Sequence, residues 1–292
     1  MFSVVVPAHD EEAVIGRCLR AITQGARDGE LEVIVVCNGC SDATAERARA
    51  FGPPVRVLET PRASKSEALN LGDSAARGFP RFYLDADVVL PLESARRVAD
   101  VLRGGRALAA APRLRVDLSD RPWAVRAYYA IWTRLPYVAQ GMIGSGVYAV
   151  SEAGRARFGA FPAIISDDGF VRLQFAPSER VSVAGARFEI APPRSLRQLI
   201  RIKVRSQKGA IQLARRFPEL LRNEDRDYGA SFGGILRRPS LWPSALVYAG
   251  VRLAARVRAI WQVYVSGLDR WERDESSRVS APGGELSGEG RP

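Results

Sequence analysis

Hydrophobic residues in the first part of the chain form short unbroken runs, and longer stretches with periodic apolar positions separate them. Four runs rich in β-branched or aromatic residues, at 2–6, 31–36, 55–58 and 82–84, predict buried strands. The stretches between them have the apolar spacing of helices and lie at 13–26, 43–51 and 66–76. Buried strands that alternate with helices predict βαβ units, and therefore an α/β fold with a parallel sheet.

The second part of the chain is less regular. The aromatic-rich stretch 123–135 predicts a helix, and the three glycines within 141–146 predict a loop or strand whose backbone approaches a ligand closely. A helix should begin near Ser166, and another should span 245–268. The tail from about residue 272 has little apolar content, so we expect it to be disordered.

Polar residues follow three of the predicted strands. His9 and three acids follow the first, an Asn-Gly-Cys-Ser-Asp segment ending at Asp42 follows the second, and Asp85 and Asp87 follow the fourth. Ligands of parallel sheets bind at the carboxyl ends of the strands. Helix capping is the alternative for Asp10 and Asp42, but Asp85 and Asp87 precede an apolar run instead of a helix start. Two such carboxylates suit Mn²⁺ or Mg²⁺.

The charge of the chain changes the list of partners. A net charge of +11 and a pI near 10.2 predict an anionic partner, which could be nucleic acid, acidic lipid or a phosphorylated small molecule. We expect no nucleic-acid partner, because no recognised binding module occurs and the carboxylates would repel a phosphate backbone. Nine basic residues and one acid lie between 194 and 222.

Cysteine usage and the chain's ends bear on compartment. Three cysteines form no disulfide framework, and Cys37 and Cys40 with one other cysteine and one histidine are a poor basis for a zinc site, so we expect reduced bystanders. The N-terminus lacks the features of a signal peptide. No apolar run approaches the roughly 20 residues that span a bilayer. The sequence therefore predicts a cytoplasmic protein. The alternative location is a peripheral one, at the inner face of the membrane.

The segments SVVVPAHDEE (3–12), VIVVCNGCSD (33–42), SKSEALN (64–70) and YLDAD (83–87) resemble, in order and spacing, the inverting family-two glycosyltransferases of GT-A fold, of bacterial type. The likeness is clear over about 2–90 and readable to about 215. It implies a three-layer α/β/α fold with a mostly parallel central sheet and a C-terminal helical extension. The expected organisation is a catalytic domain at 1–220 with a nucleotide-binding half at 1–110 and an acceptor half at 111–220, a helical extension at 221–271 and a disordered tail at 272–292.

The resemblance also implies roles for individual residues. His9 stands where the family often has an aromatic residue that stacks on the base, and the nucleotide-binding set as a whole is Pro7, His9, Glu11, Asp42, Lys65 and Asp85. Asp85 and Asp87 match the metal-binding pair, with Asp87 as the direct ligand of Mn²⁺ or Mg²⁺. Asp168 matches the catalytic base, and Asp167 stands beside it.

The resemblance reaches two further groups in the second half. The loop Gly144, Ser145 and Gly146 corresponds to the glycine-rich segment beside the acceptor. Basic residues of a late family motif, which face the donor diphosphate, correspond to Arg201, Arg205 and Lys208. A solvated basic face of a helix is the alternative reading of this group.

The predicted activity is transfer of a sugar, with inversion, from a nucleotide-diphospho-sugar to a hydroxyl of a glycan or lipid-linked acceptor, in cell-surface glycan or exopolysaccharide synthesis. One alternative is a relative that binds nucleotide-sugar without catalysis. The other is a sugar nucleotidyltransferase, which should show a glycine-rich basic loop after the first strand, where this chain is acidic.

The predicted helix 245–268 carries an apolar stripe with arginines at its edges. The stripe consists of Leu253, Val257, Ile260, Trp261 and Tyr264, and Arg252, Arg256 and Arg258 flank it. Such a stripe suits packing on the catalytic domain, a homodimer contact, or an anionic membrane surface.

Overall fold

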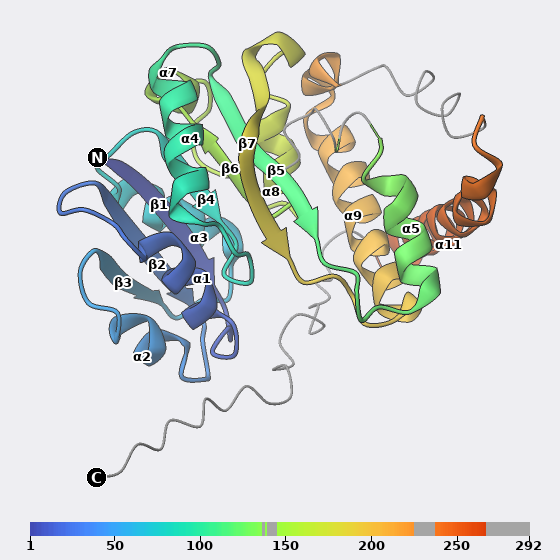
Figure 1. Ribbon diagram of the computed structural model, residues 1–292, viewed down its shortest axis with the longest axis horizontal. Coiled ribbons are helices and arrows are strands. Elements are labelled where there is room, and N and C mark those ends of the chain that lie inside the picture. Colours follow the sequence, from blue (N-terminus) through green and yellow to red (C-terminus); the bar gives the residue numbers. More distant parts are fainter. Residues whose placement is uncertain (136–137, 139–144, 225–236, 267–292) are drawn as a thin grey trace.

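A seven-stranded sheet forms the centre of the molecule in the part of the chain that the computed structural model describes, residues 1–135, 138, 145–224 and 237–266 (Figure 1). Its strand order is β3-β2-β1-β4-β6-β5-β7. The strands are β1 (Phe2–Ala8), β2 (Leu31–Asn38), β3 (Val55–Thr60), β4 (Arg81–Leu84), β5 (Ala109–Val116), β6 (Val147–Val150) and β7 (Arg180–Ile190). All of them run parallel except β6, which is antiparallel to β4 and β5.

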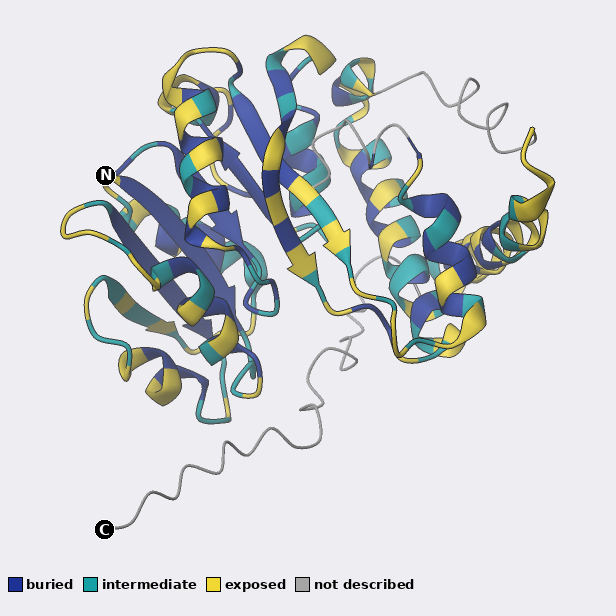
Figure 2. Ribbon diagram, in the orientation of Figure 1, coloured by how far each residue is buried: buried dark blue, intermediate teal, exposed yellow. Residues whose placement is uncertain are grey.

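Helices cover both faces of this sheet, because successive side chains of a strand point to opposite sides. Val4 and Val6 of β1 pack in a core with α1 (Ile15–Thr23), α2 (Thr44–Arg49) and α4 (Leu92–Arg103). Val5 packs on the other side, in a core that includes residues of α3, α8 and α9. These helices are α3 (Lys65–Ala75), α8 (Asp167–Arg172) and α9 (Leu196–Arg216), with the short α7 (Glu152–Arg155) after β6. The predicted three-layer α/β/α arrangement is confirmed, and strands β1, β2, β4 and β6 are buried along their whole length (Figure 2).

The register of the parallel strands brings three strand ends to one edge. Ala8 lies opposite Cys37, and Val5 lies opposite Tyr83. The loops that follow β1, β2 and β4 therefore emerge side by side, as the sequence predicted. The four predicted strands are all present and run up to two residues further than their apolar runs.

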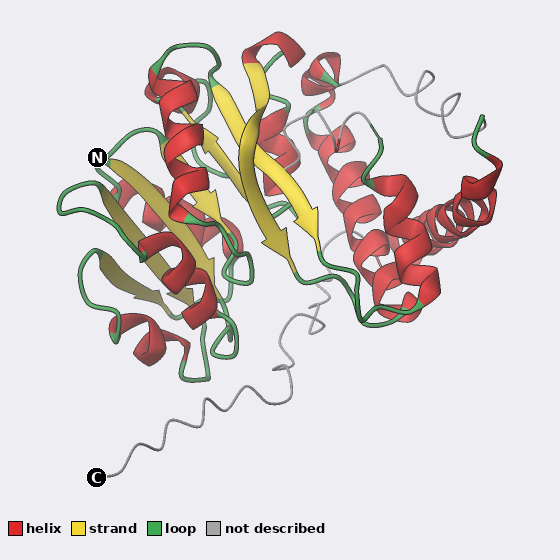
Figure 3. Ribbon diagram, viewed as in Figure 1, coloured by secondary structure: helices red, strands yellow, loops and turns green. Residues whose placement is uncertain are grey.

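A helical layer stands beyond β5 and β7 at one end of the sheet (Figure 3). Helices α5 (Trp123–Trp132), α9 and α11 (Trp242–Ser266) meet there in a core that includes Tyr128, Leu199 and Val251. The predicted C-terminal helical extension is thus present, and it packs against α5 and α9. Three short 3₁₀ turns complete the described elements: η1 (Pro177–Glu179), η2 (Pro218–Asn223) and η3 (Pro239–Leu241).

Some expectations fall outside the described residues, or are changed by them. Gly144 and the predicted disordered tail at 272–292 lie outside the described residues. Asp10 is no helix N-cap, because α1 begins later, after Val14, and Asp10 has a left-handed φ of 51°. In the part of the chain that is described, no helix combines the length and apolarity needed to cross a membrane.

Candidate active site

The loops after β1 and β2 are tied to each other through backbone N–H groups. The N–H of Glu12 donates to Asp42 Oδ2 (3.1 Å), and the N–H of Ala43 donates in return to Glu12 Oε2 (3.2 Å). Thr44 Oγ1 accepts from the N–H of Glu11 (2.7 Å), and Asp42 Oδ1 accepts from the N–H of Thr44 (3.0 Å). Ala43 and not Asp42 is the N-cap of α2, but Asp42 accepts from the first N–H of that helix and also holds the first loop in place.

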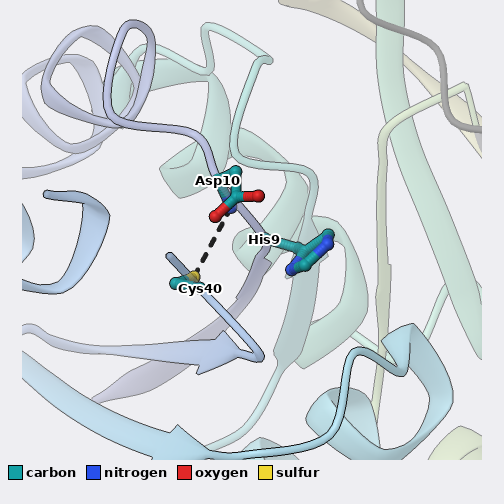
Figure 4. A group of neighbouring side chains, drawn as sticks. All are labelled: His9, Asp10 and Cys40. Atoms are coloured by element: carbon teal, nitrogen blue, oxygen red, sulfur yellow. Dashed lines mark hydrogen bonds between the residues drawn. The ribbon is translucent and has the colours of Figure 1, made fainter. Parts of the chain in front are cut away.

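His9, Asp10 and Cys40 stand together where these two loops meet (Figure 4). His9 Nδ1 lies 2.6 Å from the carbonyl oxygen of Asn38, which can only accept, so Nδ1 carries the proton. Asp10 Oδ1 accepts from the N–H of Ser41 (2.7 Å), and its own N–H points to Cys40 Sγ (3.5 Å). One ligand atom from each of the three side chains lies within 4.8 Å of the others. Nitrogen and sulfur ligands suit Zn²⁺ better than Mg²⁺.

The Cys37–Cys40 pair has a chemistry that sequence spacing alone did not show. A hydrogen bond from Cys37 lowers the pKa of the Cys40 thiol to about 7, and the same bond raises the pKa of Cys37. Both cysteines are free thiols. Cys40 is therefore the more acidic thiol of the pair, and it lies beside the position expected for the nucleoside.

Lys65 joins two carboxylates that are far apart in the sequence. Its Nζ lies 2.8 Å from Asp85 Oδ1 and 3.1 Å from Asp167 Oδ1. Lys65 is the first residue of α3, which Ser64 caps by accepting from the N–H of Glu67 (3.3 Å). The helix start therefore aims the lysine at the carboxyl end of β4.

Burial sets the electrostatics of this group. The Asp167 side chain is only 7% exposed, and its burial raises the pKa of Asp167 to about 6, against the opposing effect of Lys65 and with repulsion from Asp168 and Asp85 adding to it. Burial would lower the pKa of Lys65, but attraction to Asp167 and Asp85 outweighs it and holds that pKa above its usual range. The ammonium group is therefore charged at neutral pH.

Asp85 and Asp87 directly follow β4, at the carboxyl edge of the sheet. Both are half-buried and flank the buried Ala86. After burial itself, their charges are the main cause of the raised pKa of the Cys18 thiol on α1, so both carboxylates lie close to that side chain. The Lys65 ammonium marks a point where a positive charge is stable between Asp85 and Asp167. Oxygen ligands around such a point fit a hard divalent cation.

Asp168 differs from its neighbour Asp167 in its surroundings. It is half-buried, and its Oδ1 accepts from Ser166 Oγ (2.9 Å) and from the N–H of Gly169 (2.7 Å). The preceding backbone is held by Gln212 of α9, whose Oε1 accepts from the N–H of Ile165 (2.8 Å). Two adjacent acids thus have separate tasks: Asp167 turns inward to Lys65, and Asp168 stays at the start of α8.

The glycine segment reaches this site through its last member. The carbonyl oxygen of Gly146 accepts from the N–H of Asp85 (2.8 Å), and Gly146 has a φ of 101°. A Cβ at this position would lie 2.4 Å from Val88 Cγ2, so the close approach requires glycine. Ser145 is half-buried beside it.

The basic residues of α9 share one face but not one location. Arg201, Arg205 and Lys208 follow the i, i+4, i+7 spacing of a single helix face. Lys208 is buried and precedes Gly209, which packs against Ser166. Arg201 is exposed and lies about 10 Å earlier along the helix axis. Lys208 is therefore close to the segment Ile165–Asp168, whereas Arg201 is well separated from it.

Two polar residues of α3 support the site: Asn70, which belongs to the 64–70 segment of the family resemblance, and Asp73, which sequence reasoning missed. Asp73, side chain 11% exposed, accepts from Arg81 (2.7 Å), Arg155 (2.7 Å) and the hydroxyl of Tyr83 (2.6 Å). Asn70 pairs through its amide with both backbone groups of Phe161. A polar residue among the apolar positions of a helix was the only signal. Pro7, in contrast, is buried within β1 and acts through the backbone.

The α/β fold, with carboxylates at the carboxyl edge of its sheet, is typical of enzymes that bind nucleotide-linked substrates. Sequence comparison gives the family. Residues 3–150, half of the chain, match Glycosyl transferase family 2, and the chain belongs to that family. The predicted membership of the family-two glycosyltransferases is thereby confirmed. Glycosyltransferase AglE from Haloferax volcanii is 33% identical over 90 residues, which cover 29% of this chain and 30% of that relative.

Solved structures share the fold. The mannosyltransferase PcManGT from Pyrobaculum calidifontis, in complex with GDP-Man and Mn²⁺, has a TM-score of 0.61 at 21% identity, over 91% of this chain and 75% of that one. Glucosyl-3-phosphoglycerate synthase from Mycobacterium tuberculosis, in complex with Mn²⁺, UDP and glucosyl-3-phosphoglycerate, has a TM-score of 0.55 at 21% identity, over 77% and 81%. S. aureus TarS has a TM-score of 0.51 at 12% identity, over 92% and 88%. The predicted GT-A fold is confirmed.

Proposed function

We propose that this chain transfers a sugar from a nucleotide-diphospho-sugar to an acceptor hydroxyl with inversion at the anomeric carbon. The observation that carries the proposal is the bridge from Lys65 to Asp85 and Asp167. It gathers a cation and two carboxylates at the carboxyl edge of the sheet, directly beside Asp168. Membership of glycosyl transferase family 2 supports the same reaction.

The donor would lie along the loops after β1, β2 and β4. The nucleoside is proposed to bind to the loops after β1 and β2, at Pro7, His9, Glu11 and Asp42. Hydrogen bonds between these loops hold them in position before the donor binds. A divalent cation, Mn²⁺ or Mg²⁺, held by Asp87 and Asp85, would neutralise the charge of the diphosphate. PcManGT in complex with GDP-Man and glucosyl-3-phosphoglycerate synthase in complex with UDP both hold Mn²⁺, which supports this cofactor.

The chemical step needs a base opposite the leaving group. The acceptor oxygen forms a bond to the anomeric carbon while the bond from that carbon to the diphosphate oxygen breaks. The acceptor proton passes to the Asp168 carboxylate, which the Ser166 and Gly169 contacts hold in place. Lys208 and Arg205 would stabilise the charge of the departing diphosphate. The Ser145–Gly146 segment would lie against the acceptor.

The acceptor is proposed to be a glycan or lipid-linked hydroxyl in cell-surface glycan or exopolysaccharide synthesis. A cytoplasmic location and the absence of a nucleic-acid partner stay predictions. The two other predicted partners, an anionic membrane surface and a second copy of the chain, would bind at α11 and not at the carboxyl edge of the sheet. Against a nucleotidyltransferase, the loop after β1 is acidic; against a non-catalytic relative, Asp42, Asp85, Asp87 and Asp168 are all present.

The test is hydrolysis of UDP-, GDP- and dTDP-sugars without acceptor, in the presence of Mn²⁺, Mg²⁺ or EDTA. We expect slow release of one nucleoside diphosphate, which EDTA and Asp87→Asn abolish. Asp100→Asn on α4 is the matched control, because that carboxylate is exposed and distant from the carboxyl edge of the sheet. It should leave the rate unchanged.

The outcomes separate the rival functions. Release of pyrophosphate from a nucleoside triphosphate and a sugar phosphate would identify a nucleotidyltransferase. Tight binding of one donor without turnover, with or without a panel of acceptors, would identify a non-catalytic relative. Failure of every donor to bind in a thermal-shift assay would overturn the proposal.

A further inference from the structure

Helix α11 has two apolar faces, and only one of them packs on the rest of the protein. Tyr248, Val251, Ala255 and Ala259 are buried against α9 and α5. They recur every three or four residues, so they form a single face of the helix. The stripe of larger side chains therefore does not pack on the catalytic domain, which was one of the three alternatives that the sequence left open.

The larger apolar side chains point away from the protein. They recur at intervals of three, four and seven residues on the side roughly opposite the buried face, and each is 52–91% exposed: Leu246, Leu253, Val257, Ile260, Trp261 and Tyr264. We name these six residues the outer stripe. Figure 2 shows exposed positions along the whole length of α11. Large apolar side chains that stay exposed to water over several helical turns are typical of a surface that binds another protein or a membrane.

Positive charge frames the outer stripe. On a helical wheel Arg258 lies at one boundary between the outer stripe and the buried face, and Arg256 lies at the other. Helix α11 contains no Asp or Glu. Within the described residues neither of these arginines forms an ion pair, so their charges face outward with the stripe.

We propose that α11 docks this protein on an anionic lipid surface, with the outer stripe among the acyl chains and Arg256 and Arg258 at the headgroups. Arginine at the rim, with Trp and Tyr among aliphatic residues, is the composition of a helix that lies in the membrane interface. A second copy of the chain fits less well. Paired stripes would bring the arginine rims together, and α11 offers no carboxylate to neutralise them.

Docking would place the active site near the membrane through α9. One side of α9 carries Val204, which packs on Ala255 and Ala259 of α11. The other side carries Gly209 against Ser166, at the catalytic loop. A single rigid helix thus joins the outer-stripe helix to the loop of Asp168. This arrangement favours a lipid-linked acceptor, but the docking itself does not depend on the proposed transferase activity.

Flotation of the full chain with vesicles tests the docking without any substrate. We expect binding to vesicles of phosphatidylcholine and phosphatidylglycerol at low salt, and binding weaker by at least about tenfold to phosphatidylcholine alone or at high salt. Arg256→Gln with Arg258→Gln should weaken the anionic binding by at least about tenfold. Arg47→Gln with Arg49→Gln on α2 is the matched loss of charge and should leave most of the binding in place.

Substitution of the stripe tests the apolar part. Leu253→Gln, Ile260→Gln and Trp261→Gln together replace exposed side chains, so the fold should survive, while binding falls by about a hundredfold. Brominated lipids should quench the fluorescence of the wild type. The chain has five tryptophans, and Trp242 is also exposed on α11, so Trp242→Phe with Trp261→Phe identifies the contribution of this helix: together they should remove most of the quenching while flotation persists.

Three results would overturn the inference. The first is no flotation with anionic vesicles at low salt. The second is quenching that Trp242→Phe with Trp261→Phe leaves unchanged, which would place another surface at the membrane. The third is a concentration-dependent dimer, abolished by the stripe variant, in a chain that does not float, which would make a second copy the occupant. None of these results bears on donor hydrolysis, so the docking and the proposed function fail separately.

Discussion

At the scale of single residues, Lys65 balances the charge of the site. Asp167 has a folded pKa of about 6, raised above its ordinary value of 3.8, so its contribution to stability is lost as the pH rises from about 4 through 6. Lys65 opposes that loss, because it stabilises the carboxylate. Removing Lys65 should therefore raise the pKa of Asp167 further and leave a buried, unpaired charge at high pH.

Lys65→Met should consequently lower the free energy of unfolding by about 3 kcal/mol at pH 8 without metal, and by much less at pH 5, where Asp167 is protonated in the variant. Urea unfolding at the two pH values measures the difference. Adding Asp167→Asn to Lys65→Met should recover most of the loss at pH 8. An equal loss at both pH values would mean that Lys65 acts by packing and not by charge.

The proposed base makes a second prediction at this scale. Asp168→Asn preserves the size of the side chain and an oxygen that accepts from Ser166 and Gly169. It should lower kcat by about a thousandfold and leave the binding of nucleoside diphosphate unchanged, because proton removal affects only the transition state. Calorimetry and a transfer assay measure the two effects. Loss of nucleotide binding in step with kcat would instead assign Asp168 to the donor site.

The positions of the acids could be predicted, and their pairing could not. Asp42, Asp85 and Asp87 follow strands of a parallel sheet, and that topology alone sends them to one edge. The contact of Lys65 with Asp167 joins residues from the two halves of the chain, and no periodicity encodes which distant side chains meet. The same holds for Asp73, whose three partners come from β4 and from α7.

At the scale of elements, the short strand β6 positions β4 through a glycine. Gly146→Ala should destabilise the protein by about 2 kcal/mol or more, because the new Cβ would meet Val88 in a backbone conformation that disfavours alanine. The strain would disturb the hydrogen bond from the N–H of Asp85 to the carbonyl oxygen of Gly146, so the rate of donor hydrolysis should fall as well. Thermal unfolding and the hydrolysis assay measure both.

Gly159→Ala is the matched control for this prediction. A Cβ at Gly159 would meet no heavy atom within 4 Å, and its backbone needs no left-handed conformation. The substitution should leave stability within about 1 kcal/mol of the wild type, or raise it slightly, by restricting the unfolded chain. Similar losses from both glycine substitutions would show that the Val88 contact is not the cause.

Helix α11 shows why an element can be predicted correctly while its orientation is not. The apolar periodicity identified the helix, and the largest side chains identified a stripe. The packed face combines Tyr248 and Val251 with two small residues, Ala255 and Ala259, which let α11 approach Val204 of α9 closely. A reading by hydrophobicity ranks alanine below leucine and valine. Hydrophobicity alone therefore allowed the outer stripe to pack inward. The side of α11 that packs is instead the one whose alanines allow a close approach to α9.

At the scale of the whole molecule, the site draws on both halves of the chain. Lys65 and Asp85 come from the first half, and Gly146, Asp167, Asp168 and Lys208 come from the second. The seven-stranded sheet holds the halves together, because β6 inserts between β4 and β5. Ligands that engage both halves should therefore stabilise the folded protein as one unit, instead of tightening a single loop.

A divalent cation and a nucleoside diphosphate should therefore stabilise the molecule jointly. Alone, Mn²⁺ must compete with the Lys65 ammonium for Asp85, and a diphosphate alone meets the carboxylates of Asp85 and Asp87. Together, at about a hundredfold excess over their dissociation constant, they should add about 2.7 kcal/mol, which raises Tm by roughly 5–10 °C for a chain of this size. Calorimetric scans with each ligand, both ligands, and both plus EDTA measure the effect.

Asp87→Asn should remove the joint shift and leave the ligand-free Tm within a few degrees of the wild type. An equal shift from the nucleotide with EDTA present would mean that Lys65 and the basic residues of α9 suffice to hold the diphosphate without a metal ion.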